Sequence, residues 1–250
     1  MNRTKIEWLD GGYTWNPVTG CYHKCPYCYA IKIVKRFGVC GITEIGIEEL
    51  NKPFIDKLDG DKVSYPYGFK PTFHRYRLDK PQKIKRPQNI FVCSMADLFG
   101  KWVPDEWIKQ VFEACEKAPW HRYLFLTKKP ERYIELYKKG NLPERDNFWY
   151  GTTVNTDDQL FWWSENYNYF VSIEPIMGEF KKSGMGVLNM RWVIIGSETG
   201  NRKGKVVPKR EWIENIVNLC RERNVSVFLK DSLEKIWGGP LIREYPWRGK

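Results

Sequence analysis

Three cysteines lie within eight residues near the amino terminus, and their spacing is the feature of this sequence best suited to chemistry. Cys21, Cys25 and Cys28 form a C-x3-C-x2-C arrangement. Three thiolates on one tight loop can bind three corners of an iron–sulfur cube and leave the fourth iron open to an outside ligand. A cluster that only carries electrons normally takes four protein thiolates, so this pattern favours a catalytic metal centre on these three cysteines.

A structural zinc site is the alternative for the same residues. Its ligands would be the three clustered thiolates with His23, or with Cys40 as the fourth donor. Zinc modules usually present two separated pairs of ligands, whereas this sequence has one triplet with Tyr27 directly before its last cysteine. The scattered cysteines Cys93, Cys115 and Cys220 fall in apolar stretches, and we expect them to pack in the core.

Composition limits the class of protein. The chain has 250 residues, of which 42% are hydrophobic, and this is too apolar for a disordered chain. Its apolar runs fall short of the roughly 18 residues that a membrane span needs. The amino terminus has no apolar export signal, and an odd number of partly clustered cysteines argues against a disulfide framework. We therefore expect a cytoplasmic protein with no membrane partner.

Short apolar runs alternate with helical stretches from about residue 89 onward. The predicted strands span residues 89–95, 123–127, 149–154, 169–174, 192–197 and 225–230. Two helices are marked by apolar residues at i, i+3, i+4 and i+7 after Pro104 and Pro208. Residues 13–20 are interpreted as a first strand that leads into the cysteines, and residues 29–37 as its helix. Because such repeats need crossover connections, the pattern predicts an α/β fold with a parallel sheet.

Polar side chains follow each predicted strand. They are Ser94 and Asp97, residues 127–129, residues 152–155, Glu174, residues 196–198, and Lys230 with Asp231. In parallel barrels the carboxyl ends of the strands carry the chemistry, although strand ends are also polar simply because they reach solvent. Glu174 lies in an apolar context where an unpaired carboxylate would be costly, so it needs a partner or a ligand.

The cysteine loop, with an aromatic residue before its last cysteine, resembles the signature of radical S-adenosylmethionine (radical SAM) enzymes. The chain also resembles an uncharacterised, phage-associated radical-SAM-like family. The segments that carry this second resemblance are residues 4–8, 14–21, 25–30, 91–99, 126–130, 172–175 and 193–200. The resemblance covers roughly residues 3 to 240. It implies one domain over residues 1–240, a complete or partial (βα) TIM-like barrel of about six to eight parallel strands. The domain would carry a basic, aromatic-rich insertion at about 60–88, and residues 241–250 would form a basic tail.

The resemblance also implies cofactors and an activity. Cys21, Cys25 and Cys28 would hold a 4Fe–4S cluster, and S-adenosyl-L-methionine would bind its open iron. Cleavage of the sulfonium would give a 5′-deoxyadenosyl radical that abstracts a hydrogen atom. An electron donor such as flavodoxin or ferredoxin would be a partner.

Several site residues are predicted from this resemblance and from their positions at strand ends. The Gly-Gly-Glu that many radical SAM enzymes carry after the second strand is absent, so Asp97 is the candidate for its role. The predicted cofactor contacts are Tyr27 beside the adenine, Ser94, Asp97, Thr153, Asn155 and Gly196. The predicted catalytic residues are Glu174, Glu198 and Lys230.

The positive charge bears on the substrate. The formal net charge is +11, and residues 70–88 carry seven Lys or Arg against one Asp, interleaved with Tyr and Phe. Such a stretch suits DNA or RNA, because cations neutralise phosphates and rings stack on bases, although a solvated basic surface has the same composition. The predicted substrate-binding residues are Lys83, Lys85, Arg86, Lys128, Lys129 and Arg202.

The sequence alone therefore leaves three possible functions. The first is a radical SAM enzyme that modifies or repairs a nucleic acid base or a nucleotide. The second is a radical SAM enzyme that acts on a peptide or a small metabolite. The third is a non-enzymatic zinc or iron–sulfur protein that binds nucleic acid.

Overall fold

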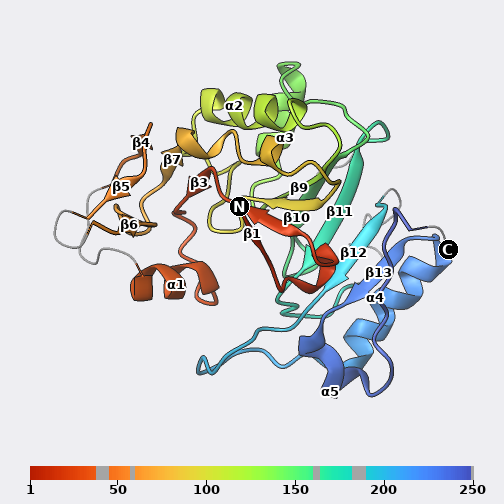
Figure 1. Ribbon diagram of the computed structural model, residues 1–250. Helices are drawn as coiled ribbons and strands as arrows, with labels where there is room; N and C mark the ends of the chain where they lie inside the picture. Colours follow the sequence, from red (N-terminus) through yellow and green to blue (C-terminus); the bar gives the residue numbers. More distant parts are fainter. Residues whose placement is uncertain (38–44, 57–59, 160–163, 182–189, 249–250) are drawn as a thin grey trace.

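The computed structural model describes residues 1–37, 45–56, 60–159, 164–181 and 190–248. Its main sheet has eight strands in the order β1-β2-β8-β9-β10-β11-β12-β13, and all neighbours from β2 onward run parallel (Figure 1). The parallel strands are β2 (Tyr13–Trp15), β8 (Asn89–Val92), β9 (Arg122–Thr127), β10 (Phe148–Thr153), β11 (Asn168–Ile173), β12 (Trp192–Ile195) and β13 (Ser226–Leu229). The short β1 (Asn2–Arg3) pairs antiparallel with β2. The predicted α/β fold with a large parallel sheet is confirmed.

Helices cover one face of this sheet. They are α2 (Asp105–Glu116), α3 (Glu131–Lys138) and α4 (Arg210–Glu222), and each adds an apolar stripe to one large core. The two predicted helices after Pro104 and Pro208 are therefore confirmed. Cys93, Cys115 and Cys220 are buried in this core, as expected, and Cys40 lies outside the described residues.

The opposite face of the sheet carries a second core, rich in aromatic rings. It contains Phe91, Leu124, Trp149, Phe170, Trp192, Ile194 and Phe228 from the strands, with Trp8 and Leu9 of the 3-10 helix η1 (Glu7–Leu9). Tyr245 and Trp247 from the end of the chain pack against it. Successive strand residues point to opposite faces, so Tyr123 and Phe125 join the helix-side core while Leu124 joins this one.

The two edges of the main sheet, β1 and β13, do not pair with each other in the part of the chain that the structure describes. Residues 242–244 instead run along β13, where the Leu229 N–H donates to the Ile242 carbonyl at 2.8 Å. From there the Arg243 guanidinium reaches the Glu7 carboxylate at 2.9 Å. The carboxyl-terminal segment thus links β13 to η1 through side chains, and the closed form of the expected barrel is not seen.

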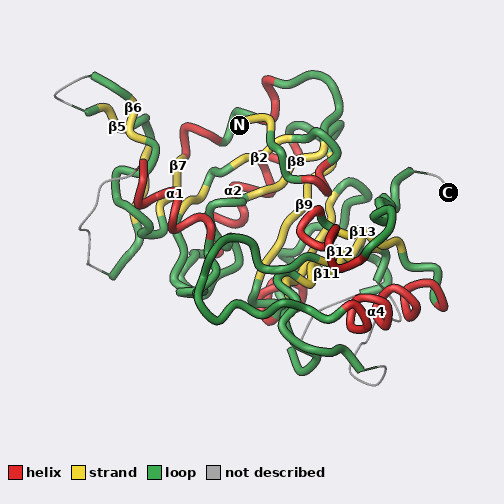
Figure 2. Tube along the Cα trace, turned by 90° about the horizontal axis from the view of Figure 1, so that it is seen from below, coloured by secondary structure: helices red, strands yellow, loops and turns green. Residues whose placement is uncertain are grey.

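A smaller sheet lies beside the first half of the main one. Its strands are β3 (Val18–Thr19), β7 (Thr72–His74) and β4 (Glu48–Leu50), and a hairpin of β5 (Phe54–Ile55) and β6 (Lys62–Val63) lies nearby. Two views place this hairpin far from α4 (Figures 1 and 2). Phe73 of β7 stacks on Trp107 of α2 with ring centroids 5.1 Å apart, which fixes the small sheet to the core.

The remaining elements are short, except for α1 (Tyr29–Phe37), which begins directly after the cysteines at the predicted position. The others are η2 (Arg75–Arg77), η3 (Pro81–Lys83), η5 (Asp231–Leu233) and α5 (Glu234–Trp237). None of the described helices has the length and apolar character that crossing a membrane requires.

Candidate functional site

The cysteine loop joins β3 to α1 and lies at the carboxyl end of β8. Gly20 adopts a φ of +85°, and a Cβ at this position would lie 2.3 Å from the Lys70 carbonyl oxygen, so the chain needs glycine here. Gly20 also forms a bridge with Ala96, which follows β8. The Cys21 N–H then donates to the Phe69 carbonyl at 3.2 Å. The loop therefore starts from a fixed backbone position.

Cys21, Cys25 and Cys28 are free, half-buried thiols on this loop. Burial raises the pKa of Cys21 to about 12, and the nearby Asp97, Cys25 and Cys28 add to the shift. In the described part of the chain, no three His, Cys, Asp or Glu side chains converge as one metal ion requires. A cube of four irons distributes its thiolates over separate irons, whereas a single zinc ion needs ligands that converge on one point.

Asp97 anchors the loop to the end of β9. Its carboxylate accepts hydrogen bonds from the Thr127 hydroxyl at 2.8 Å, the Lys128 N–H at 2.9 Å and the Phe99 N–H at 3.0 Å. The fourth contact is His23 of the loop, whose Nε2 lies 2.7 Å from Asp97 Oδ2. The carboxylate is thus held by four protein groups, and its predicted role toward a cofactor stays a prediction.

Tyr27 joins the loop to two further strand ends. Its hydroxyl donates to Asn155 Oδ1 at 2.7 Å, after β10, and accepts from Lys128 Nζ at 3.2 Å, after β9. The Asn155 amide also donates to the Pro175 carbonyl at 2.7 Å, after β11. Three predicted site residues are therefore in direct contact, and we call this group the Tyr27 latch: Tyr27, Lys128 and Asn155.

Lys128 is a cation close enough to the Cys25 thiol to act on it electrostatically. Burial lowers the pKa of its ammonium, while Cys25 and Asp97 oppose that shift. In turn burial raises the pKa of Cys25, and Lys128 opposes that rise. A positive charge here stabilises a thiolate on the loop, which is the form that binds iron.

Glu174 and Lys230 form an ion pair across three neighbouring strands. Glu174 follows β11, Lys230 follows β13, and their side chains meet over Gly196, which follows β12. A Cβ at Gly196 would lie 2.9 Å from Lys230 Cδ and 3.2 Å from Glu174 Cγ. The missing side chain at Gly196 therefore lets the pair form. The partner that the sequence required for Glu174 is Lys230.

Glu198 is paired with Arg202 instead of facing the pair above. Arg202 Nε and Nη2 donate to its two carboxylate oxygens at 2.6 and 2.7 Å, and the Glu198 side chain is 3% exposed. These hydrogen bonds hold the pKa of Glu198 below its ordinary value, with smaller contributions from Lys205 and Lys32. The Glu198 carboxylate and the Arg202 guanidinium therefore form a closed ion pair.

Three other predicted residues lie at the same end of the sheet. The Ser94 hydroxyl donates to Asn16 Oδ1 at 3.2 Å, and its carbonyl accepts from the Tyr29 hydroxyl. Thr153 is half-buried at the end of β10, opposite Ser172 of β11. The Lys129 N–H donates to Thr127 Oγ1 at 2.9 Å. Their predicted roles remain predictions.

Lys83, Lys85 and Arg86 lie at the opposite end. They precede β8, next to Trp120 and Arg122 at the start of β9. The six residues of β9 span roughly 20 Å, so these cations are separated from Lys128 by the length of the sheet. The structure does not bring them to the cysteine loop. Lys83 is also paired with Asp79.

Other cations of the basic stretch are bound within the protein. Lys70 pairs with Glu48 at 2.6 Å, and Arg75 pairs with Glu49 at 2.8 Å, both on β4. Arg77 donates to the Asn16 carbonyl at 3.0 Å. Much of the charge that the sequence concentrates in residues 70–88 thus holds the small sheet in place and is not a continuous free surface.

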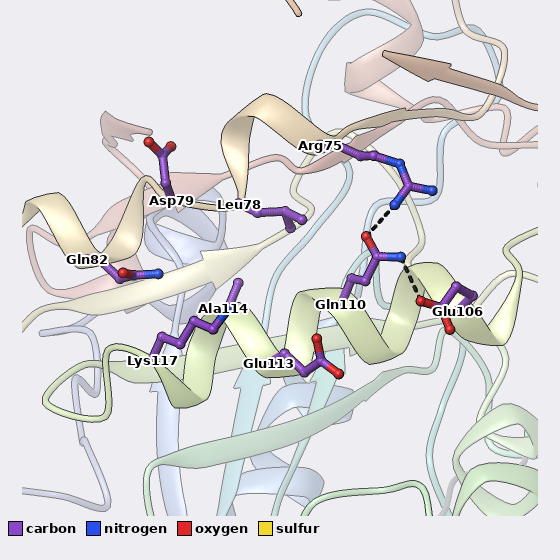
Figure 3. A pocket seen from close by; sticks show the side chains of 9 residues that line it. All are labelled: Arg75, Leu78, Asp79, Gln82, Glu106, Gln110, Glu113, Ala114 and Lys117. Carbon is purple, nitrogen blue, oxygen red and sulfur yellow. Dashed lines mark hydrogen bonds between the residues drawn. The ribbon is translucent and has the colours of Figure 1, made fainter. Parts of the chain in front are cut away.

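A groove of about 500 Å³ lies on the outside of the sheet, between η2, η3 and α2 (Figure 3). Arg75 donates to Gln110 at 2.6 Å, and Gln110 donates to Glu106 at 2.8 Å. The residues that line it are Arg75, Leu78, Asp79, Gln82, Glu106, Gln110, Glu113, Ala114 and Lys117. None of these is a predicted site residue, so the groove is separate from the cysteine loop.

The sequence did not reveal the contacts that fix the loop. In the sequence His23 is only a candidate zinc ligand, yet in the structure it pairs with Asp97. Asn16 holds both the Ser94 hydroxyl and the Met95 N–H, at 3.2 and 2.9 Å. No sequence pattern marks Lys32 of α1. The available signal was position, because each of these residues lies on or beside the loop that the cysteines define.

These observations define a mixed α/β protein with a large, mostly parallel sheet and a cysteine loop docked on the carboxyl ends of its strands. The chain belongs to the family described as "Protein of unknown function (DUF5131)", whose model matches residues 3–239. No curated protein matches it significantly.

Among solved structures, similar ones are of spore photoproduct lyase. One is a mutant with bound AdoMet and dinucleoside spore photoproduct, at 10% identity and a TM-score of 0.46, and the alignment covers 90% of this chain and 74% of that one. Another mutant gives 11% identity and a TM-score of 0.45, covering 96% and 78%.

Proposed function

We propose that this protein is a radical SAM enzyme that acts on a nucleic acid base or a nucleotide. The observation that carries the proposal is the set of three free thiols, Cys21, Cys25 and Cys28, on one loop at the carboxyl ends of a parallel sheet. In the folds where such sheets close, this end carries the chemistry. A loop with three thiols and no fourth one in its own segment leaves one iron of a cube free for an outside ligand.

The reaction would divide between the cofactors and the protein. Cys21, Cys25 and Cys28 would hold the cluster, which would supply the one-electron reduction that cleaves S-adenosylmethionine to methionine and a carbon radical able to take a hydrogen atom from the substrate. A donor such as flavodoxin or ferredoxin would be the source of that electron. The protein's part is to bind, to orient and to exclude water.

Specific residues of this chain would supply that part. The Tyr27 latch and the Asp97–His23 contact hold the cysteine loop at fixed distances from β9 and β10. Lys128 favours the thiolate form of Cys25. Glu174 and Lys230 place an acceptor and a donor of hydrogen bonds on the strands facing the loop, where both can orient a polar substrate.

Anaerobic reconstitution with iron and sulfide tests the activity. With a low-potential reductant, the wild-type protein should bind about four irons and convert S-adenosylmethionine to methionine and 5′-deoxyadenosine. Cys28→Ala should lose the iron and the conversion, because one of the three ligands is missing. Cys220→Ala is the matched control, since that thiol is buried on the core-facing side of α4, and it should retain both.

The other functions give different results in the same experiment. A protein that holds one tight zinc ion and releases no 5′-deoxyadenosine would be a structural metal protein, and the proposal would be wrong. Conversion that is stimulated by peptides or small metabolites but not by oligonucleotides would retain the radical chemistry and reject the nucleic acid as substrate.

A further inference from the structure

Cations gather where α1 and the loop between β12 and α4 approach each other, beside the cysteine loop. Residues 29–37 and 196–205 together contain six Lys or Arg and one carboxylate, that of Glu198. Figure 1 shows this loop extending from β12 toward α1. We call four of the exposed cations on these two segments the α1–loop surface: Lys32, Arg36, Lys203 and Lys205.

Contacts show that the two segments meet at Gly200. Lys205 Nζ donates to the Gly200 carbonyl at 2.9 Å, and Lys32 Nζ lies 3.8 Å from the position of a Cβ on the same glycine. Both ammoniums also lower the pKa of the Glu198 carboxyl, although Arg202 has the larger effect. Glu198 is almost fully buried and already holds Arg202 by two hydrogen bonds. Two ammoniums thus converge on a point where the nearby carboxylate is already neutralised.

We propose that the α1–loop surface binds the phosphate backbone of a single-stranded nucleic acid, with one phosphate near Gly200 between Lys32 and Lys205. This inference rests on the proposed function, because it names the surface that would bring the substrate to the cysteine loop. Like charges held together repel each other, and an anion between them relieves that repulsion.

The extent of the surface favours a polymer over a small anion. Arg36 lies one turn further along α1 than Lys32, about 6 Å away, so cations continue beyond the first phosphate. Tyr29 and Phe37 on the same helix are 52% and 62% exposed, and rings among cations are what stacked bases require. A single strand fits best, because a base must leave a duplex before an enclosed site can reach it.

The position also fits delivery to the proposed site. α1 begins one residue after Cys28, and the loop begins at Gly196, which touches Glu174 and Lys230. Lys83, Lys85 and Arg86, which the sequence favoured, lie at the far end of the sheet. The two groups of cations therefore make opposite predictions for the same measurement.

Fluorescence anisotropy of a labelled 12-nucleotide single strand tests this with iron-free protein. Its binding constant is measured between 50 and 300 mM salt. The slope of log K against log salt is negative, and each lost phosphate contact reduces its magnitude by about 0.7. Lys32→Ala with Lys205→Ala should therefore reduce the magnitude by about 1.4. Lys109→Ala with Lys138→Ala removes two exposed cations from α2 and α3 and is the matched control; its slope should equal that of the wild type.

Other outcomes overturn the inference. An equal slope in the Lys32/Lys205 variant and the wild type would reject this surface, as would a reduced slope in Lys83→Ala with Lys85→Ala and Arg86→Ala alone. Because the measurement needs no cluster, it separates the two proposals. Binding with the expected slopes but no S-adenosylmethionine cleavage would reject the proposed activity only, and cleavage without oligonucleotide binding would reject this surface only. Circular dichroism establishes that each variant is folded.

Discussion

The two ends of the parallel sheet differ sharply on the face turned away from the helices. At the amino end this face is filled with rings, including Trp149 of β10 and Phe170 of β11, against Trp8 of η1. Four residues further along the same two strands, the same face carries Thr153 and Glu174. Each strand therefore changes from apolar to polar along one row of side chains.

This difference shows how one sheet separates stability from chemistry. The strands are in register, so the change occurs at the same level in neighbours: Phe170 pairs across from Trp192, and the pairing ends with Ile173 opposite Ile195. Directly beyond that level, Glu174, Gly196 and Lys230 lie together. The rings stabilise the fold at the amino end of the sheet, and charged groups face the cysteine loop at the carboxyl end.

The largest effect that tests this division comes from one strand. Trp149→Ala removes a ring that is 5% exposed and should lower the free energy of unfolding by about 3–5 kcal/mol. Thr153→Ala changes the same face of β10 at its other end and should cost less than about 1 kcal/mol. Urea denaturation followed by circular dichroism measures both. Similar losses in the two variants would contradict the division.

The ion pair at the carboxyl end gives the next largest effect. Lys230→Met leaves the Glu174 carboxylate without its partner, so the free energy of unfolding should fall by about 1–3 kcal/mol. Turnover should fall roughly 100-fold, if the pair orients the substrate in the proposed reaction. Adding Glu174→Gln should restore part of the stability, because no charge is left unpaired, but not the turnover. Thermal unfolding and 5′-deoxyadenosine release measure these two quantities.

Lys139→Met is the control for that comparison. Lys139 pairs with Asp105 at 2.9 Å on the outer, solvent-facing side of the helices. Its loss should change stability by less than about 1 kcal/mol and leave turnover unchanged. A turnover loss as large as that of Lys230→Met would mean that the effect is not specific to the carboxyl end.

The sequence predicted the sheet well and the contacts of the site poorly, for different physical reasons. All six predicted strands from residue 89 onward were found, because a buried parallel strand must be a nearly continuous apolar run. Strand ends also placed Lys128, Asn155, Glu174 and Lys230 at one edge. Which of these side chains pair with each other could not be predicted from the sequence. The pairing depends on which strands are neighbours in the sheet and on the space left by the missing side chain at Gly196.

The basic stretch at residues 70–88 is the clearest case in which composition misled. Its charge is real, but β7 turns Lys70 and Arg75 toward Glu48 and Glu49, which lie more than twenty residues earlier. Lys83 to Arg86 then lead into the amino end of β8. A run of like charges shows how much charge is present, whereas its partners and its end of the sheet depend on topology.

Low pH should lower the stability of the protein through His74, which lies beside the start of the cysteine loop. His74 of β7 is buried, with Nε2 2.9 Å from Thr19 Oγ1, directly before the cysteine loop. Burial and the charge of Arg77 lower its pKa to about 3, from an ordinary 6.5. Below pH 6.5 the His74 imidazole therefore binds a proton in the unfolded chain but stays neutral in the folded protein. Stability is complete above pH 6.5 and falls toward pH 3, by at most about 1.4 kcal/mol per pH unit from this group.

Urea denaturation at several pH values checks this, with His74→Asn as the comparison. The variant should be less stable at pH 7, yet its stability should depend less on pH between 6.5 and 4. His121 also has a pKa lowered by burial, so some dependence will remain in the variant. Parallel curves for the two proteins would show that His74 does not carry the effect.

The smallest effect concerns how tightly the cysteine loop is held to the sheet. Tyr27→Phe keeps the ring but removes the hydroxyl that Lys128 and Asn155 share. One such hydrogen bond contributes about 0.5–1.5 kcal/mol, so the loop should open more often and its thiols in iron-free protein should react up to about tenfold faster with an aromatic disulfide reagent. Tyr167→Phe removes a buried hydroxyl that donates to the Leu142 carbonyl at 2.9 Å, behind the sheet. It should cost similar stability without changing the thiol rate, because only the carboxyl end depends on the Tyr27 latch. Equal thiol rates in the wild type and in Tyr27→Phe would mean that other contacts, such as that of Asp97 with His23, fix the loop without the Tyr27 latch.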